Sequence, residues 1–356
     1  MIVTPGDNTD EKLLSWPDTV VFGRTYHPEM KPIDILRQYK ARGKRVIWDI
    51  DDDFWAVNPD NPSVLVSNSQ KDQYESFVRE ADAITTPSEV LAKKIRKLTK
   101  KPIFICPNGI NFNIFQKRPR MHKELIVGYA GAASHYNDLN LVSDVILELQ
   151  KKYEFAFQVY GLMGGALESE MYIYNEYLRR SSMPEKSPYF RNALAWWEKV
   201  RQVKVFPHIP FHVPFYTPLL HPFKLSQLDF DIALAPLQDN EFNHGKSCIK
   251  FYEYAAVDSM TLASDVLPYS KEVNYRAKNT FKDWYSKLER LIVDKDFREK
   301  LLKEQRDWVV KNRSLENIGL AWEMALQLPG GLKVLTQNAN LLQKSQSDIT
   351  RDNSAV

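Results

Sequence analysis

The sequence predicts an α/β protein built from two parallel-sheet domains in tandem. Short, almost wholly apolar runs alternate with segments of helical periodicity, and the alternation occurs twice along the 356 residues. Nearly continuous apolar strands are typical of parallel sheets that helices cover on both faces. Between the two halves, residues 111–124 are polar, basic and aperiodic. We therefore expect a first domain at 1–110, a linker at 111–124 and a second domain at 125–328.

The first domain is expected to hold four strands. Each is a short apolar run, at 19–23, 45–50, 83–87 and 102–109. Apolar residues recur at helical spacing between these runs, as at Tyr74, Phe77, Val78 and Ala81. Thr86-Pro87-Ser88-Glu89 is typical of a helix start, with proline at the first helical position and a side chain suited to capping.

The second domain repeats the pattern with five expected strands. They are the apolar runs at 125–131, 154–161, 203–206, 230–237 and 260–264. Residues 162–200 fit no strand–helix unit and are expected to form an extra helical excursion, while 329–356 are expected to form a flexible tail. Two such Rossmann-like domains would face each other across a cleft at the carboxyl ends of their strands, where folds of this class bind ligands.

Composition excludes several classes of protein. Apolar residues make up 44% of the chain, so global disorder is excluded, and a net charge of +3 is too balanced to indicate nucleic-acid binding by itself. Cys106 and Cys248 stand in apolar contexts and are expected to be reduced, buried thiols. The first residues lack a secretion signal, and no apolar run is long enough to span a membrane. We expect a cytoplasmic protein, with peripheral membrane contact left open.

A phosphate-binding pattern occurs in "KSCIKFYEYAA" (246–256). Lys246, Lys250 and Glu253 fall at i, i+4 and i+7, which predicts one face of a helix that starts just after a buried strand. A helix start attracts phosphate, two ammonium groups strengthen the attraction, and a carboxylate can accept two ribose hydroxyl protons. The pattern favours a nucleoside diphosphate. The alternative is a solvated helix face with salt bridges.

An acidic cluster follows the second expected strand. Asp49, Asp51, Asp52 and Asp53 stand within five residues, where like charges repel one another. Three interpretations remain open: carboxylates that orient or deprotonate an acceptor hydroxyl, a divalent-metal site, or an exposed capping loop. None of the seven histidines stands at a metal-ligand spacing, and we predict no metal site from the sequence.

Four segments resemble the retaining GT-B glycosyltransferases, and one of them, residues 79–111, is similar to the end of their N-terminal domain. "DIALAPLQDNEFNHGKSCIKFYEYAAVDSMTLASDVLPY" (231–269) resembles their donor-site signature, and "GYAGAASHYNDL" (128–139) resembles the opening strand and loop of the same domain. "VIWDIDDDFW" (46–55) is similar to an acidic segment of one bacterial and phage subgroup. The resemblance implies the GT-B fold and transfer of a sugar, with retention, from a nucleotide-diphosphate sugar to a hydroxyl acceptor, with no metal or other cofactor required.

The resemblance also implies roles for particular residues. Glu253 matches the second glutamate of the family's E-x7-E motif, whereas Gly245 stands where the first would fall. The expected donor-binding residues are Gly131, Ser134, His135, Asn243, Lys246, Ser247, Lys250 and Glu253. The expected catalytic residues are Asp51, Asp52 and Lys246, and the expected acceptor-side residues are Arg24, Asp53 and Trp55.

Two other functions stay open. Because the first glutamate is missing, the chain could be a degenerate protein that binds a nucleotide sugar without turnover. The basic stretches 93–101 and 117–123, with aromatic residues near Trp196, leave a phage-type glycosyltransferase of hydroxymethyl-pyrimidine DNA bases as the other alternative. The acceptor is therefore a glycan, a lipid-linked glycan or modified DNA.

The first domain is shorter than is usual for the family. Four strands and no glycine-rich loop before residue 19 leave one sheet edge bare. A bare edge invites pairing with another chain. The open expectation is that a second copy of this chain, or another partner, covers that edge.

Overall fold

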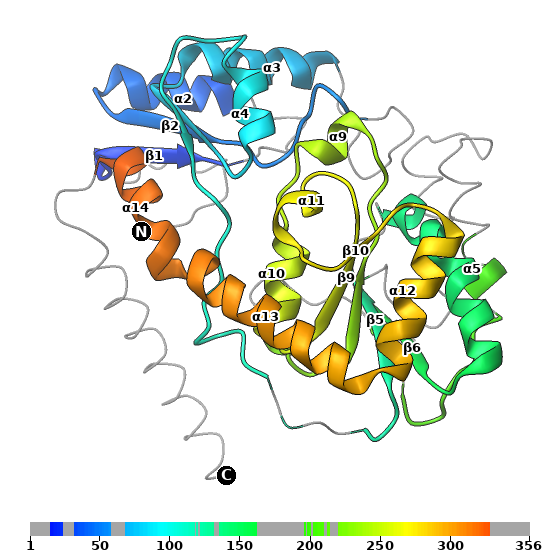
Figure 1. Ribbon diagram of the computed structural model, residues 1–356. Coiled ribbons are helices and arrows are strands. Elements are labelled where there is room, and N and C mark those ends of the chain that lie inside the picture. The colour runs from blue at the N-terminus through cyan, green and yellow to red at the C-terminus, as the bar shows by residue number, and fades with distance from the viewer. Residues whose placement is uncertain are drawn as a thin grey trace, which may run out of the picture.

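The computed structural model describes most of the chain. The described residues are 15–23, 32–57, 68–117, 119, 122–131, 135–161, 196, 198–200, 202–209, 212–213 and 220–327. They form two parallel sheets, each covered by helices, which lie one after the other along the chain (Figure 1). The predicted α/β class with two tandem domains is confirmed.

The first sheet has four strands in the order β1-β2-β3-β4, and every pairing is parallel. All four strands were expected from the sequence. The strands are β1 (Thr19–Phe22), β2 (Arg45–Asp49), β3 (Ala83–Thr86) and β4 (Ile103–Ile105). The helices between them are α2 (Pro32–Ala41), α3 (Asn68–Glu80) and α4 (Glu89–Ile95). Ser88 caps α4 by accepting a hydrogen bond from the Leu91 amide, so the helix begins two residues later than expected and Pro87 precedes it instead of occupying its first position.

The second sheet has six strands in the order β10-β9-β8-β5-β6-β7, again all parallel. The strands are β5 (Ile126–Ala130), β6 (Ala156–Tyr160), β7 (His212–Val213), β8 (Ile232–Ala235), β9 (Met260–Ser264) and β10 (Arg276–Ala277). From β5 the chain first adds β6 and β7 on one side of the sheet, and then adds β8, β9 and β10 on the other side of β5. Because ligands of such sheets bind outside the carboxyl ends at the reversal, the ends of β5 and β8 mark the expected site.

Helices cover both faces of this second sheet. On one face α5 (Tyr136–Lys152) packs beside α12 (Phe281–Val293), and on the other α10 (Ile249–Ala256) packs beside α13 (Lys295–Arg313) (Figure 1). The remaining helices are α8 (His221–Leu225), α9 (Glu241–His244), α11 (Tyr269–Glu272) and α14 (Leu315–Leu326). Each face carries its own apolar core, so the strands are buried on both sides.

One predicted strand of the second domain is wrong. Residues 203–206 lie outside the sheet: Val203 is buried, but Val205 is 68% exposed. Phe206 instead forms an isolated antiparallel bridge with Ile209, so the chain turns there before it reaches β7.

The last helix returns to the first domain. The Arg45 guanidinium donates a hydrogen bond to the Ala325 carbonyl at 2.6 Å, and the Cys106 thiol donates to the Ala321 carbonyl at 3.6 Å. Figure 1 shows α14 beside β1. Residues 315–326, placed in the second domain by the sequence, therefore pack against the first. Both cysteines are free and buried, as expected.

Two other expectations fall largely outside the described residues. Of the expected excursion at 162–200, only Trp196 and 198–200 are described, and Trp196 is buried against Tyr136. The expected tail at 329–356 is not described. Within the described part of the chain, no helix combines the length and apolarity needed to cross a membrane.

Candidate functional site

The connection that follows β8 forms one wall of the candidate site. Asn240 caps the one-turn helix α9, accepting a hydrogen bond from the Asn243 amide at 2.9 Å. The buried Asn243 side chain donates to the Gln238 carbonyl, also at 2.9 Å. Asn243, an expected donor-binding residue, thus holds the shape of the loop from within.

Lys246 is not on the helix, which corrects the expected single face of Lys246, Lys250 and Glu253. Helix α10 begins at Ile249, with the non-helical Cys248 as its N-cap residue, and Lys246 lies in the preceding turn. The Lys246 amide donates to the Asn243 carbonyl at 3.1 Å. Only Lys250 and Glu253 share a helical face, at i and i+3. Residues 245–248 separate α9 from α10 and are not helical, so the helical spacing does not extend back to Lys246.

The Lys246 ammonium reaches across to the first domain. Its Nζ lies 3.2 Å from the Asp52 Oδ1 and 4.5 Å from the centre of the Phe242 ring. Both charged side chains are mostly buried. A cation held between a carboxylate and an aromatic face is available to an anion that can displace the carboxylate.

Lys250 lies one turn deeper, against the end of β5. Its Nζ donates to the Ala130 carbonyl at 3.0 Å and lies 5.3 Å from the centre of the Tyr129 ring. Burial lowers the pKa of Lys250 to about 8; the Glu253 charge opposes this shift and Lys246 adds to it. Lys246 and Lys250 are therefore close enough for their charges to interact.

Gly131 is enclosed by these same side chains. A Cβ at Gly131 would stand 2.3 Å from the Tyr129 hydroxyl and 2.7 Å from the Lys250 Nζ, distances that force a displacement. The Tyr129 hydroxyl is buried and has no hydrogen-bond partner among the described residues. An unsatisfied buried hydroxyl is costly, and this one lies beside the expected phosphate position.

Glu253 is held by a histidine that the sequence did not single out. The His221 Nε2 lies 3.2 Å from the Glu253 Oε1, and the His221 Nδ1 lies 3.2 Å from the Tyr160 hydroxyl. The His221 and Tyr160 rings are stacked, with an interplanar angle of 9°. The imidazole can donate from Nε2 to the Glu253 carboxylate, while its Nδ1 is hydrogen-bonded to the Tyr160 hydroxyl. Glu253 is thereby fixed at the carboxyl edge of the sheet, since Tyr160 ends β6.

His135 stands at the start of α5, facing both lysines. Its Nδ1 lies 2.6 Å from the Asp138 Oδ2, and the other Asp138 oxygen accepts from the Gln238 amide at 2.7 Å. Burial and the nearby Lys250 charge lower the pKa of His135. The ring is therefore neutral near pH 7, donates its Nδ1 proton to Asp138 and leaves Nε2 as an acceptor. Two other expected residues, Ser134 and Arg24, lie outside the described residues.

The four aspartates of the acidic cluster have different surroundings. Asp49 accepts from the Thr85 hydroxyl at 2.6 Å, and burial raises its pKa. Asp53 is buried 2.7 Å from the Lys94 Nζ. Asp52 pairs with Lys246, and Asp51 is exposed. Asp51 therefore lies toward solvent, Asp52 pairs with the other domain, and the buried Asp53 also lies against that domain, at Gly245.

Trp55, expected on the acceptor side, packs against the first domain. Its ring meets the Trp48 ring edge-on at 6.5 Å, and its amide donates to the Asp53 Oδ1 at 3.2 Å. These contacts stabilise the acidic loop. Whether an acceptor also touches Trp55 stays a prediction.

Polar contacts join the two domains directly. The Asn108 side chain donates to the Ser247 hydroxyl at 2.7 Å, and Lys94 lies 2.9 Å from the Glu241 carboxylate as well as beside Asp53. With Lys246–Asp52, these pairs place the loop after β8 against the ends of the first sheet (Figure 1). Gly131, His135, Lys246, Lys250 and Glu253 are the candidate donor-binding residues of this site, and we call them the donor-site residues below.

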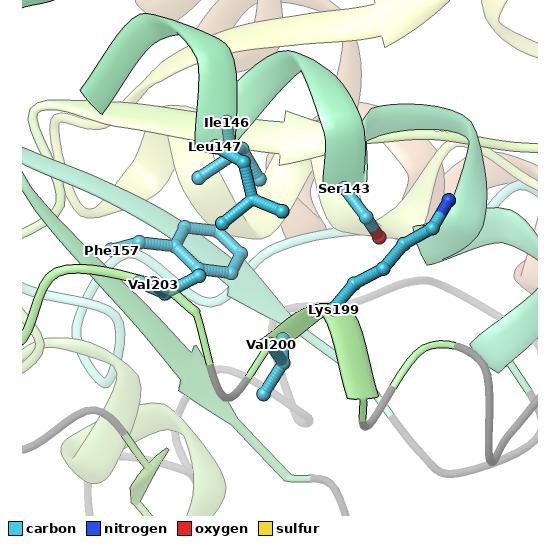
Figure 2. A pocket seen from close by; sticks show the side chains of 7 residues that line it. All are labelled: Ser143, Ile146, Leu147, Phe157, Lys199, Val200 and Val203. Carbon is cyan, nitrogen blue, oxygen red and sulfur yellow. The ribbon is translucent and has the colours of Figure 1, made fainter. Parts of the chain in front are cut away.

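A separate hollow lies away from this site, between α5, β6 and residues 198–200. Figure 2 shows its lining, which is mostly apolar: Ser143, Ile146, Leu147, Phe157, Lys199, Val200 and Val203. Its two polar side chains are already engaged, Ser143 with the Leu139 carbonyl and Lys199 with Asp144. This hollow is a packing gap and offers no convergent polar groups to a ligand.

Neither a protein-family model nor a curated relative matches the sequence. Solved structures do match in fold. Anabaena HepE in complex with UDP and glucose superposes with a TM-score of 0.57 at 10% identity, covering 88% of this chain and 78% of HepE. The sucrose-phosphate synthase of Thermosynechococcus elongatus gives 0.55 at 12% identity, covering 86% and 72%. An E. coli trehalose-6-phosphate structure bound with UDP-2-fluoro glucose gives 0.56 at 14% identity, covering 90% and 76%.

These likenesses extend over most of the chain and include both sheets. The architecture of this protein is the two-domain α/β fold of the GT-B glycosyltransferases.

Proposed function

We propose that this protein is a glycosyltransferase that moves a sugar from a nucleotide-diphosphate sugar to a hydroxyl acceptor, with retention and without an essential metal. The observation that carries the proposal is the convergence of Lys246 and Lys250 at the carboxyl edge of the second sheet. Both stand next to the reversal of strand order at β5, where sheets of this class bind nucleotides.

The leaving diphosphate would meet two kinds of positive group. Lys246 and Lys250 supply ammonium charges, and the first-turn amides of α10 have no acceptors within the helix. Fixed positive groups aimed at a departing diphosphate stabilise the charge that develops as the glycosidic bond breaks. This chain can therefore stabilise its leaving group with its own side chains.

Glu253 would accept hydrogen bonds from the ribose hydroxyls. Its Oε1 is engaged by His221 at 3.2 Å, which orients the carboxylate and leaves further lone pairs for a sugar. Since HepE is described with UDP, and the E. coli structure with UDP-2-fluoro glucose, uridine is the first nucleoside to test.

The structure gives a reason for glycine, where the family motif has its first glutamate, at position 245. A Cβ at position 245 would stand 3.1 Å from the Asp53 Cβ, so a longer side chain there would displace the acidic loop. The first domain's aspartates occupy the space that faces the donor loop. We assign Asp51 and Asp52 to the acceptor, which they would orient or deprotonate.

The test is release of nucleotide diphosphate from a panel of nucleotide sugars, with UDP-glucose first. Calorimetric titration with UDP measures binding in parallel. Release that requires both an acceptor and Lys246 supports transfer. Tight binding with no release, for any sugar or acceptor in the panel, would identify a degenerate binding protein. Absence of both binding and release would refute the proposal.

The acceptor panel should include oligosaccharides, lipid-linked glycans and duplex DNA containing hydroxymethyl-pyrimidines. Binding to DNA that weakens steeply with salt would favour the DNA-modifying alternative. No binding at low salt would remove it. The configuration of the product's glycosidic bond, read by NMR, tests retention.

A further inference from the structure

A second cluster of chemically active side chains lies far from the donor-site residues. His122, Glu124 and His208 each offer a ligand atom, and these atoms all lie within 4.8 Å of one another. Glu124 and His208 form the closest pair, with the His208 Nε2 at 2.8 Å from the Glu124 Oε1. The rings of His122 and His208 stand 5.9 Å apart between centres.

The fold brings these residues together from two distant segments. His122 and Glu124 end the linker, immediately before β5 begins at Ile126. His208 belongs to the turn closed by the Phe206–Ile209 bridge, which precedes β7. Both segments therefore lie at the amino ends of parallel strands, while the donor-site residues lie at the carboxyl ends.

The turn that carries His208 is anchored on both sides. Ile209 is buried in the apolar core beneath the sheet, and Phe206 packs against that core. On the other side, Glu124 is one residue from Leu125, which packs against the opposite core. The backbone on each side of the cluster is thus fixed by packing, and the three side chains converge from two anchored segments.

The donor set indicates the class of ion. Two imidazoles and one carboxylate are typical ligands of Zn²⁺ and of related divalent transition metals, whereas Ca²⁺ and Mg²⁺ prefer all-oxygen sites. With metal–ligand bonds of about 2.0–2.2 Å, the ligand atoms of one ion lie roughly 3.4 Å apart. The ligand atoms, which now all lie within 4.8 Å of one another, would have to move to that spacing when an ion binds. Because His208 is more than half exposed, a water molecule can supply the fourth ligand.

We propose that His122, Glu124 and His208 bind a divalent transition metal ion of the zinc class. The bound ion cross-links the interdomain linker to the turn before β7, and so fixes the end of the linker to the second domain. It takes no part in sugar transfer, because the opposite edge of the sheet carries the donor-site residues. The proposal stands whether or not the protein is a transferase.

The direct test is calorimetric titration of the full, chelator-treated protein with ZnCl₂. We expect one equivalent to bind with a Kd on the order of 10⁻⁶ M. His208→Ala and His122→Ala should each abolish that binding, and Glu124→Gln should weaken it by roughly tenfold or more. His244→Asn is the matched control, because His244 is a surface histidine paired with Asp239 outside the cluster, and it should bind zinc like the parent. Circular dichroism checks that each variant is folded.

Limited trypsin digestion tests the cross-link itself, since Lys117 and Lys123 lie in the linker. Zinc should slow cleavage after these two lysines in the parent and in His244→Asn, but not in His208→Ala. The proposal is overturned if the parent binds no zinc, or if the three cluster variants bind it as tightly as the parent does. Equal protection of His208→Ala and the parent would overturn the cross-linking role.

Discussion

The Lys246 ammonium lies 3.2 Å from the Asp52 carboxylate, and the two residues belong to different domains. The principal candidate for binding phosphate is therefore already paired with the principal candidate for handling the acceptor. A diphosphate that enters must compete with Asp52 for Lys246, and its departure restores the pair. If the donor binds as proposed, this one ammonium group would couple donor binding to the contact between the domains.

Lys246→Ala should lower kcat/KM by about 10²–10³, the effect of removing one group that stabilises a developing negative charge. The fold should survive, because Lys246 lies in a turn and its backbone bond to Asn243 remains. Lys271→Ala is the control: that lysine also pairs across the domains, with Glu89, but at an exposed position. Steady-state kinetics should show less than a twofold change for the control. Equal rates for Lys246→Ala and the parent would remove Lys246 from the mechanism.

Asp52→Asn should separate binding from turnover. Without the carboxylate, Lys246 is freed for phosphate, and UDP should bind roughly threefold to tenfold more tightly. The turnover number should fall, because the carboxylate no longer acts on the acceptor. Titration calorimetry and kcat measure the two effects on one sample. Weaker UDP binding would show that the pair supports the site rather than competing with the donor.

Donor affinity should depend on pH through Lys250. Its pKa is lowered to about 8, so the charge that attracts phosphate is lost as pH rises through 8, and UDP should bind roughly tenfold more weakly at pH 9 than at pH 7. Glu253, Lys246 and Asp138 are the charged groups that act on it. Lys250→Met should bind UDP more weakly at pH 7 and lose most of this pH dependence. A parent whose UDP affinity is the same at pH 7 and pH 9 would contradict the assignment.

The same lysine gives a stability prediction of opposite sign. The pKa of Lys250 is about 8 in the folded protein, below its ordinary value of 10.5. Between these two pH values the unfolded chain keeps a proton on Lys250 that the folded protein has released. The contribution of Lys250 to the free energy of unfolding therefore increases as the pH rises from 8 to 10.5. Denaturant titrations at pH 7.5 and 9.5 should show a larger gain for the parent than for Lys250→Met. An equal change in the two proteins would show that Lys250 titrates normally.

His221→Asn should act through Glu253. The substitution removes the stacked ring that orients the carboxylate, and the KM for the donor should rise by about tenfold with a smaller change in kcat. Glu253→Gln should raise KM further. A double variant no worse than Glu253→Gln alone would show that the two residues act as one unit. Additive losses would give His221 a separate role.

Gly131→Ala should weaken donor binding by displacing Lys250 and Tyr129, whose side-chain ends stand 2.7 and 2.3 Å from the added carbon. Gly23→Ala is the matched control, since a Cβ there meets nothing within 4 Å. UDP titration of both variants is the measurement. If Gly131→Ala and Gly23→Ala bind UDP with similar affinity, then Lys250 and Tyr129 can move aside without weakening donor binding.

Much of the fold was predictable because buried parallel strands are short apolar runs. All four strands of the first sheet and four of the second were expected. The strand predicted at 203–206 was wrong, because an apolar residue such as Val205 can also be exposed in a turn. The two-residue strand β10 (Arg276–Ala277) has no apolar run and was not expected.

The site was predictable only in part. Spacing identified Lys250 and Glu253 because neighbours on a helix are fixed by its period, but it misplaced Lys246, since residues 245–248 before α10 are not helical. His221 is 32 residues from Glu253, and His208 is 84 from Glu124. Such pairs arise from the order of strands in the sheet, which no local periodicity encodes.

The chain passes between the domains twice, and Ile110 and Ser314 bridge the two passages in parallel register. Gly109 lies so close to Ile318 there that a Cβ would be 2.4 Å from its Cδ1. Backbone hydrogen bonds tie the two passages at this point, from the Ile110 amide to the Arg313 carbonyl and from the Leu315 amide to the Ile110 carbonyl. We expect the two passages to stay together if the domains separate, so that separation would be felt first at other contacts between the domains, such as Lys246–Asp52.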